Sequence, residues 1–159
     1  MFALHIITLG KLKEKYWWEA EAEYLKRLNP YFKMEIIELK EESFSEKDKP
    51  EQIKRKEAEK IKNVLEKIKG AFIIALDEHG KAFSSVQFAE QIKKITTGQT
   101  NNIIFVIGGP LGLDESILQS ANLKLSLSAM TFTHQMARIF LLEQIYRAAM
   151  INAGRKYHY

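Results

Sequence analysis

The sequence of 159 residues contains no cysteine, only three prolines and no long apolar segment. Without cysteine the chain has no disulfide, thiolate metal site or cysteine nucleophile, which favours a reducing, cytoplasmic location. The longest uninterrupted apolar run is residues 71–76, far short of the about 20 residues that a membrane-spanning helix requires. The N-terminus has neither the basic region nor the cleavage site of a signal peptide. We therefore expect no membrane span and no signal peptide.

The length and an apolar content of 46% predict a single domain over residues 1–159. The net charge is +4, and the excess is concentrated near the C-terminus, where residues 120–159 contain five Lys or Arg against one Glu. Such an excess attracts a polyanion such as RNA, although it also suits a surface adapted for solubility. Residues 40–69 carry many charges of both signs, which is typical of a solvated helix face.

Short β-rich apolar runs alternate with helical periodicity along the chain. Each predicted strand precedes a predicted helix, which indicates an α/β fold with a mostly parallel sheet and helices on both faces. Ser84 and Gln87 have the spacing of a capping box before the third helix. The predicted strands are residues 4–9, 34–39, 72–76, 103–107 and 123–127, and the predicted helices are residues 16–28, 50–69, 86–95, 114–119 and 133–153.

The last predicted helix is apolar around much of its circumference, with residues 139–142 and 148–151 among its apolar positions. One sheet face covers only one stripe of a helix, so the remaining apolar surface needs a second neighbour. A symmetric partner subunit would supply it and predicts a homodimer. A central position of this helix within a monomer is the alternative.

A glycine-rich turn follows the fourth predicted strand, where residues 108–114 are GGPLGLD. In open α/β sheets ligands bind at the carboxyl ends of the strands, and glycines let a ligand approach the backbone closely. The turn lacks the Gly-Lys-Ser/Thr ending of a P-loop and the spacing of the dinucleotide fingerprint. It indicates either a ligand site or a purely structural strand-to-helix turn.

Two further strand ends are predicted to lie at the same edge. Small and hydroxyl residues are concentrated in residues 125–134, and Leu76 and Asp77 end the third strand. Together with the glycine turn they would form a pocket of the kind that binds a nucleotide-type cofactor. Helix capping and loop hydrogen bonding are the alternative roles for the hydroxyls. The histidines show no metal-ligand spacing, so we expect no metal site, and we expect His134 to make a structural hydrogen bond.

Several segments spread along the chain form a distinctive combination. They are GKLK, EYLKRL, FVIGGPLGL, LSLSAMTF, HQMAR, EQIYRA and a terminal YH, at residues 10–13, 23–28, 105–113, 125–132, 134–138, 143–148 and 157–158. Together these segments resemble the RlmH family of large-subunit ribosomal RNA pseudouridine N3-methyltransferases. The similarity extends over essentially the whole chain.

The resemblance implies a SPOUT α/β fold with five to six strands, in which the C-terminal segment forms a trefoil knot that binds S-adenosylmethionine. It also implies a homodimer that methylates N3 of a pseudouridine in 23S ribosomal RNA, with the assembled ribosome as the expected substrate and free RNA as the alternative. Carried over residue by residue, the cofactor contacts are Leu76, Gly108, Gly109, Leu127, Ser128, Ala129, Met130, Thr131 and Phe132.

The C-terminal tail is the predicted source of catalytic groups. The N3 proton of pseudouridine must leave during methylation, so a base near the acceptor is expected. We expect His158 to be this base, Tyr157 to stack on or position the acceptor, and Arg138 to organise the RNA or the subunit interface. Thr133 stands where the family usually has proline, and we expect this change to loosen the loop before the last helix.

Tyr159 stands where the family usually has a basic residue, so Arg155 or Lys156 would replace that RNA contact. Two other classes of function stay open from the residues alone. A ribosome-binding α/β module without catalysis would bind RNA in a salt-dependent manner and would bind no cofactor. A different nucleotide-dependent enzyme would use the glycine turn for phosphates.

Overall fold

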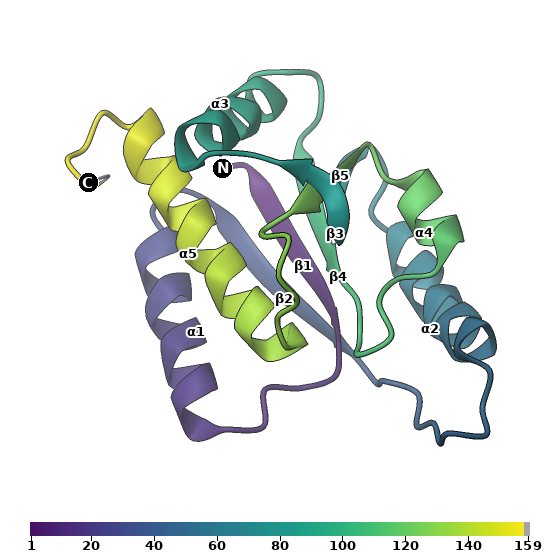
Figure 1. The fold of residues 1–159 in the computed structure, drawn as a ribbon. Helices are drawn as coiled ribbons and strands as arrows, with labels where there is room; N and C mark the ends of the chain where they lie inside the picture. Colours follow the sequence, from purple (N-terminus) through teal and green to yellow (C-terminus); the bar gives the residue numbers. More distant parts are fainter. Residues whose placement is uncertain (158–159) are drawn as a thin grey trace.

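The computed structural model describes residues 1–157. Strands and helices alternate along the chain, and two layers of helices enclose one sheet (Figure 1). The elements are β1 (Ala3–Leu9), α1 (Lys15–Leu28), β2 (Lys33–Leu39), α2 (Pro50–Leu65), β3 (Ala71–Ala82), α3 (Ser85–Thr96), β4 (Asn102–Ile107), α4 (Glu115–Ser120), β5 (Leu123–Ser126) and α5 (His134–Asn152).

The five strands form one sheet in the order β2-β1-β4-β3-β5, and every neighbouring pair is parallel. The central strand β4 is buried from Ile103 to Ile107, as its continuous apolar run predicts for a strand covered on both faces. Helices α1, α3 and α5 cover one face, and α2 and α4 cover the other (Figure 1). The predicted parallel α/β fold is confirmed, whereas the trefoil knot stays a prediction.

Each face of the sheet has its own apolar core. Successive residues of a strand point to opposite faces, so β1 contributes Ile6 to one core and Ile7 to the other. Ile6 shares its core with Phe88 of α3 and Leu142 of α5, and Ile7 shares its core with Ile61 of α2. Burying each of these large side chains contributes about 2 kcal/mol, so both helix layers are needed to stabilise the sheet.

Two elements, β3 and α2, end four or more residues away from the predicted ends. β3 continues to Ala82 because its pairing with β5 changes register after Leu76, and the apolar periodicity does not detect this irregular extension. α2 ends at Leu65 rather than at residue 69. Beyond it, the N–H groups of residues 67 and 68 bond to carbonyls three residues back, a tighter geometry than that of an α-helix.

Side-chain caps define the starts of α3 and α5. The predicted capping box is present, because Ser84 accepts a hydrogen bond from the Gln87 N–H at 3.2 Å and the Gln87 side chain accepts one from the Ser84 N–H at 2.9 Å. At α5, the Thr133 hydroxyl oxygen accepts a hydrogen bond from the Met136 N–H at 3.3 Å. Thr133 thus supplies an N-cap for α5, and the expected loosening of the loop before this helix stays a prediction.

Helix α5 lies between α1 and α3 on one face of the sheet (Figure 1). Ile139, Leu142 and Ile145 are buried there, and Phe140 is 40% exposed. The chain itself therefore covers most of the apolar circumference that suggested a partner subunit. None of the helices in the described part of the chain has the length and apolar content needed to cross a bilayer.

A buried ion cluster attaches α5 to α1 and to the sheet. The Arg138 guanidinium donates to the carboxylates of Glu21 on α1 and Glu38 on β2, the latter at 2.8 Å. It also lies 3.5 Å from the Thr8 hydroxyl of β1. Because Arg138 is only 3% exposed, it does not face solvent, where RNA would bind. The contacts of Arg138 lie inside the protein and hold α5 to its neighbours, and they do not form a surface for RNA.

Replacing Arg138 with alanine should lower the free energy of unfolding by about 3 kcal/mol, because Glu21 and Glu38 would lose their cation in a water-poor region. Urea denaturation followed by circular dichroism measures this change. Arg155→Ala is the control, since Arg155 is exposed, and it should change stability by less than about 0.5 kcal/mol. Equal stabilities of the two variants would contradict the proposed importance of the cluster.

Candidate functional site

The carboxyl ends of β3, β4 and β5 lie side by side at one edge of the sheet. The register pairs Ala75 with Val106 and Leu76 with Leu125. The irregular part of β3 after Leu76 and the segments after β4 and β5 therefore begin at about the same level, at the edge where α/β proteins bind ligands. The fold thus brings together the three segments that the sequence assigns to the cofactor.

The glycine turn after β4 is closed on itself. The Gly112 N–H donates to the Gly109 carbonyl at 3.0 Å. A Cβ atom on Gly108 would lie 2.8 Å from the Gly112 carbonyl carbon, which is too close for any side chain. A Cβ atom on Gly109 would have no neighbour nearer than 3.5 Å, an ordinary contact. Gly108 and Gly109 are half-buried, so a ligand can still reach their backbone groups.

The loop between β5 and α5, residues 127–133, is held by hydroxyl groups and by Glu78 of β3. The Thr131 hydroxyl donates to the Glu78 carboxylate at 2.8 Å, and the Ser126 hydroxyl donates to the Glu78 carbonyl at 3.0 Å. The Ser128 hydroxyl oxygen accepts a hydrogen bond from the Met130 N–H at 3.0 Å. These hydroxyls therefore have the loop-stabilising role that the sequence leaves open as the alternative to ligand contact.

Glu78 belongs to this site although the sequence analysis does not identify it. It lies in the irregular part of β3, and its carboxylate is 43% exposed and 3.4 Å from Nε2 of His79. The signal for it is the polar, glycine-ended run DEHG directly after an apolar strand, at residues 77–80, because such a run indicates an interruption of a strand. Glu78 can therefore hold the loop and still meet a positively charged ligand.

An apolar cavity of about 320 Å³ lies beside the loop. Leu127 and Phe132, two of the predicted cofactor contacts, line it together with Phe83 and Phe140. Glu143 of α5 adds a carboxylate to the lining. Such a cavity suits a ligand that has both a flat ring and a positively charged group. The ring would pack against the apolar side chains, and the charged group would lie near the carboxylate.

The end of the described chain packs against α5. The Tyr157 ring lies 4.9 Å from the Tyr146 ring and 4.9 Å from the Arg147 guanidinium. Tyr146 in turn lies 6.4 Å from the Tyr24 ring of α1, and Arg147 bonds to Glu143 at 3.0 Å. Aromatic and cation contacts thus hold Tyr157 against α5, the helix that also carries the cavity-lining Glu143.

The other residues predicted to take part in chemistry have different positions. His158 and Tyr159 lie outside the described residues. Nε2 of His134 is buried without a hydrogen-bond partner in residues 1–157, so the structural hydrogen bond expected of this histidine is missing at that nitrogen. Burial lowers the pKa of His134, which keeps the ring neutral at pH 7. Within residues 1–157 no group of His, Asp and Glu side chains is placed to bind a metal ion.

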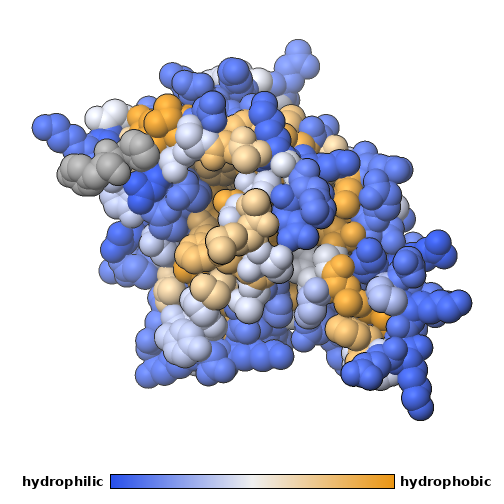
Figure 2. Space-filling model, in the orientation of Figure 1, coloured by the Kyte–Doolittle hydropathy of each residue, from blue (hydrophilic) through white to orange (hydrophobic). Residues whose placement is uncertain are grey.

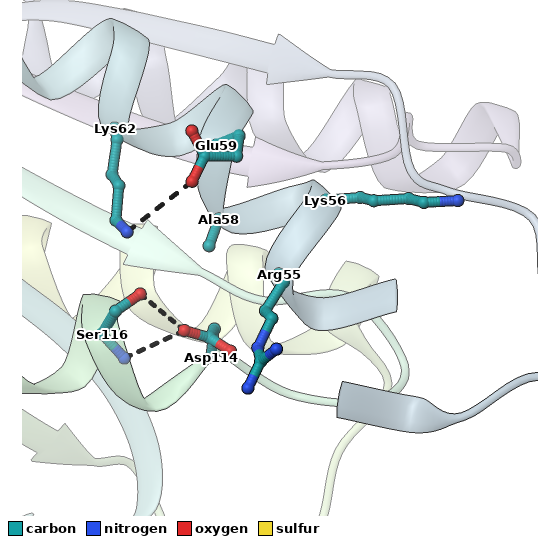
Figure 3. A pocket seen from close by; sticks show the side chains of 7 residues that line it. All are labelled: Arg55, Lys56, Ala58, Glu59, Lys62, Asp114 and Ser116. Carbon is teal, nitrogen blue, oxygen red and sulfur yellow. Dashed lines mark hydrogen bonds and ion pairs between the residues drawn. The ribbon is translucent and has the colours of Figure 1, made fainter. Parts of the chain in front are cut away.

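A second hollow, of about 350 Å³, lies between α2 and α4 on the opposite face of the sheet (Figure 3). Its polar groups are engaged with each other: Lys62 lies 3.8 Å from Glu59, and Asp114 accepts a hydrogen bond from the Ser116 N–H at 3.0 Å. Lys56 points away from them (Figure 3). None of the predicted site residues lines this hollow, so the edge formed by β3, β4 and β5 is the candidate functional site.

A family model described as "Predicted SPOUT methyltransferase" matches residues 2–158. The chain belongs to the SPOUT methyltransferase family. Membership implies that the site takes a methyl donor, and the RlmH resemblance noted above is consistent with it. The described edge of the sheet is therefore a candidate site for methyl transfer.

Two relatives have the name "Ribosomal RNA large subunit methyltransferase H". Their similarity to this chain is consistent with its membership of the SPOUT family. The one from Pelotomaculum thermopropionicum is 43% identical over 162 residues and covers the full length of both chains. The one from Clostridium acetobutylicum is 47% identical over 157 residues, which cover 96% of this chain and 97% of the relative.

One solved structure has a similar overall fold. It is a probable methylase family protein from Haemophilus influenzae Rd KW20, with a TM-score of 0.58 and 13% sequence identity. The match covers 98% of this chain and 70% of that structure. At this identity the match concerns the fold alone.

The two glycines at the end of β4 should respond differently to alanine. Gly108→Ala should lower the free energy of unfolding by about 2 kcal/mol, because its Cβ would overlap the backbone of the turn. Gly109→Ala should lower it by less than about 1 kcal/mol, because its Cβ has room. Urea denaturation of the two variants measures the difference, and equal losses would contradict the described turn geometry.

Proposed function

We propose that the protein transfers a methyl group from S-adenosylmethionine to N3 of a pseudouridine in 23S ribosomal RNA. The observation that carries this proposal is the full-length similarity to two proteins named as large-subunit ribosomal RNA methyltransferases. The convergence of the three predicted segments at one edge of the sheet supports it. The acceptor nitrogen and the assembled ribosome as substrate follow from the resemblance to the RlmH family.

The residues at this edge fit S-adenosylmethionine. Its adenine needs an apolar slot and backbone hydrogen-bonding groups, and its sulfonium favours nearby carboxylates. Leu127 and Phe132 line the apolar cavity, and Glu143 adds a carboxylate to it. Gly108 supplies a backbone that carries no side chain and is half-buried. These features support Gly108, Leu127 and Phe132 as residues that hold the cofactor, and we assign Leu76, Gly109 and the rest of the segment 127–132 to it from the resemblance to the RlmH family.

When bound, the cofactor supplies a methyl group on a positively charged sulfur. The chain must hold the acceptor ring in line with that methyl group and exclude water, because alignment lowers the barrier of such a transfer. The N3 proton of the acceptor would have to pass to a base held by the chain. We assign this base to His158 and the positioning of the acceptor to Tyr157.

The cations of the C-terminal region divide into two groups. Arg138 is buried between carboxylates, and Arg147 is engaged with Glu143 and Tyr157. We assign to Arg138 the positioning of α5 and of the loop that precedes it. Arg155 and Lys156 are exposed, and we assign to them the attraction of the RNA backbone.

We also propose that the protein is a homodimer. Figure 2 shows apolar side chains gathered over the β5–α5 loop and the adjacent part of α5. Met130 is 75% exposed and Phe140 is 40% exposed. Phe132 is half-buried, and the centroid of its ring lies 5.1 Å from that of the Phe140 ring. An exposed apolar patch next to a binding site is typical of a protein interface. A second copy over this patch would place two cofactor sites near one interface.

Incubation with methyl-labelled S-adenosylmethionine and ribosomes that lack the modification tests the reaction. The label should appear on N3 of a 23S pseudouridine, as located by mass spectrometry of the nucleosides. The single-turnover rate of His158→Ala at saturating substrate should fall about hundredfold, the size of effect expected for a general base. Label on another nucleoside would overturn the assigned acceptor, and an unchanged His158→Ala rate would remove His158 from catalysis.

Replacing Phe140 with aspartate should weaken the dimer, because a carboxylate would be buried in an apolar interface. We expect the dimer dissociation constant to rise at least about 30-fold, as measured by analytical ultracentrifugation. Phe44→Asp is the matched control, since Phe44 is 46% exposed and lies on the segment between β2 and α2. A Phe140→Asp protein as dimeric as the control would contradict the assigned interface.

A further inference from the structure

Arg147 on α5 lies between the candidate site and the C-terminal tail. Its guanidinium donates two hydrogen bonds to one carboxylate oxygen of Glu143, one of them from Nε at 3.0 Å. The central carbon of the guanidinium also lies 4.9 Å from the centre of the Tyr157 ring. The Arg147 and Glu143 side chains are only 22% and 19% exposed. Because water screens a largely buried ion pair less, this pair holds its geometry better than a surface pair does.

Glu143 connects Arg147 to the wall of the apolar cavity. Its second carboxylate oxygen accepts a hydrogen bond from the side-chain amide of Gln144 at 2.7 Å. The side-chain oxygen of Gln144 accepts one from the Ser85 hydroxyl of α3, also at 2.7 Å. Glu143, Gln144 and Ser85 all line the cavity. The carboxylate that Arg147 holds is therefore fixed with respect to α3 and to the cavity.

The chain turns back after α5 and brings Tyr157 onto the same helix. The Arg155 N–H donates to the Met150 carbonyl at 2.9 Å, and the Gly154 N–H donates to the Ile151 carbonyl at 3.0 Å. Gly154 has a φ of 66°, a left-handed conformation that glycine adopts without strain. These are the features of the Schellman motif, which ends a helix. The tail after the motif consequently lies against α5.

An aromatic contact and a cationic contact hold the Tyr157 ring in this position. The ring meets the Tyr146 ring edge to face, with centroids 4.9 Å apart and planes at 76°. Arg147 adds a cation over the ring, which is attracted to the negative face of an aromatic system. Arg147 thus touches both the cavity-lining Glu143 and Tyr157, the residue next to His158.

We infer that Arg147 is a positioning residue for methyl transfer: it joins the wall of the cofactor cavity to Tyr157 and so fixes the point from which the tail reaches the reacting groups. This inference rests on the proposed function, because it takes the cavity as the cofactor site and the tail as the source of the catalytic groups. Within residues 1–157, the cavity is lined by Glu143 and not by Arg147. Arg147 therefore acts through Glu143 and Tyr157 and does not touch the cofactor.

This arrangement predicts separate effects on rate and on affinity. Removing the guanidinium releases Tyr157 and should slow methyl transfer, because a misplaced group aligns poorly with the reacting atoms. Its removal also leaves the Glu143 carboxylate without this cation, which favours a positively charged cofactor. Affinity for S-adenosylmethionine should therefore stay the same or increase while the rate falls. A general loosening of the site would instead weaken binding and slow transfer together.

NMR of the cofactor-free protein tests whether Arg147 holds the tail. The nuclear Overhauser effect between the Tyr146 and Tyr157 rings should be present in the wild type and about fivefold weaker in Arg147→Ala. Arg147→Lys should weaken it less, because an ammonium keeps the charge but lacks the planar guanidinium fork. Arg55→Ala is the matched control, since Arg55 is an exposed arginine on α2, and it should leave the effect unchanged.

Single-turnover methyl transfer and calorimetric titration then measure the consequence for the reaction. With saturating S-adenosylmethionine and ribosomes that lack the modification, the Arg147→Ala rate should fall about tenfold. Its dissociation constant for S-adenosylmethionine should rise by no more than about twofold. Arg147→Lys should recover part of the rate, and Arg55→Ala should match the wild type in both measurements. Circular dichroism of each variant confirms that it is folded.

The outcomes separate this inference from the proposed function. An unchanged ring contact in a folded Arg147→Ala protein overturns the hold on the tail, whatever the protein binds. A weakened contact with a wild-type transfer rate overturns the link to catalysis. A dissociation constant that rises as much as the rate falls overturns the positioning role. If the wild-type protein fails to bind S-adenosylmethionine or to methylate ribosomes, the proposed function fails, while the ring contact still decides whether Arg147 holds Tyr157.

Discussion

The parallel pairing of β3, β4 and β5 is the constraint on which the candidate site depends. Residues 71–75 of β3 pair in register with residues 102–106 of β4, and Leu76 pairs with Leu125 of β5. Three connections that are more than 15 residues apart in sequence therefore begin at one edge. Parallel strands cannot be joined by tight turns, and the helices that join them also bury the two faces of the sheet. The same helices that stabilise the sheet thus align its carboxyl ends.

Several carboxylates hold the segments around these ends. Glu78 holds the β5–α5 loop through Thr131, Glu57 accepts a hydrogen bond from the Glu42 N–H in the segment before α2, and Glu21 and Glu38 hold Arg138 on α5. Each contact joins elements that are distant in sequence. Hydrogen-bonded polar groups in a low-dielectric interior fix relative positions more strictly than apolar contacts do, because their geometry is directional.

Helix α5 illustrates how one composition can serve two purposes. Its apolar circumference suits a helix enclosed by α1, α3 and the sheet, and that enclosure accounts for Ile139, Leu142 and Ile145. Phe140 is the exception, because it faces outward beside Phe132. A partner subunit would therefore cover a small exposed patch and not the whole apolar circumference of the helix.

The sequence by itself determined the order of the strands and helices along the chain, the parallel α/β class and the capping box of α3, because these depend on local periodicity and on side chains within a few residues of each other. It also marked Leu76, Gly108 and the segment 127–132 through the resemblance to a known family. The tertiary structure alone decided the contacts of Glu57, Glu78 and Arg138. Their partners lie 15 to 117 residues away, and whether a charged side chain is buried depends on neighbours that only the folded chain supplies.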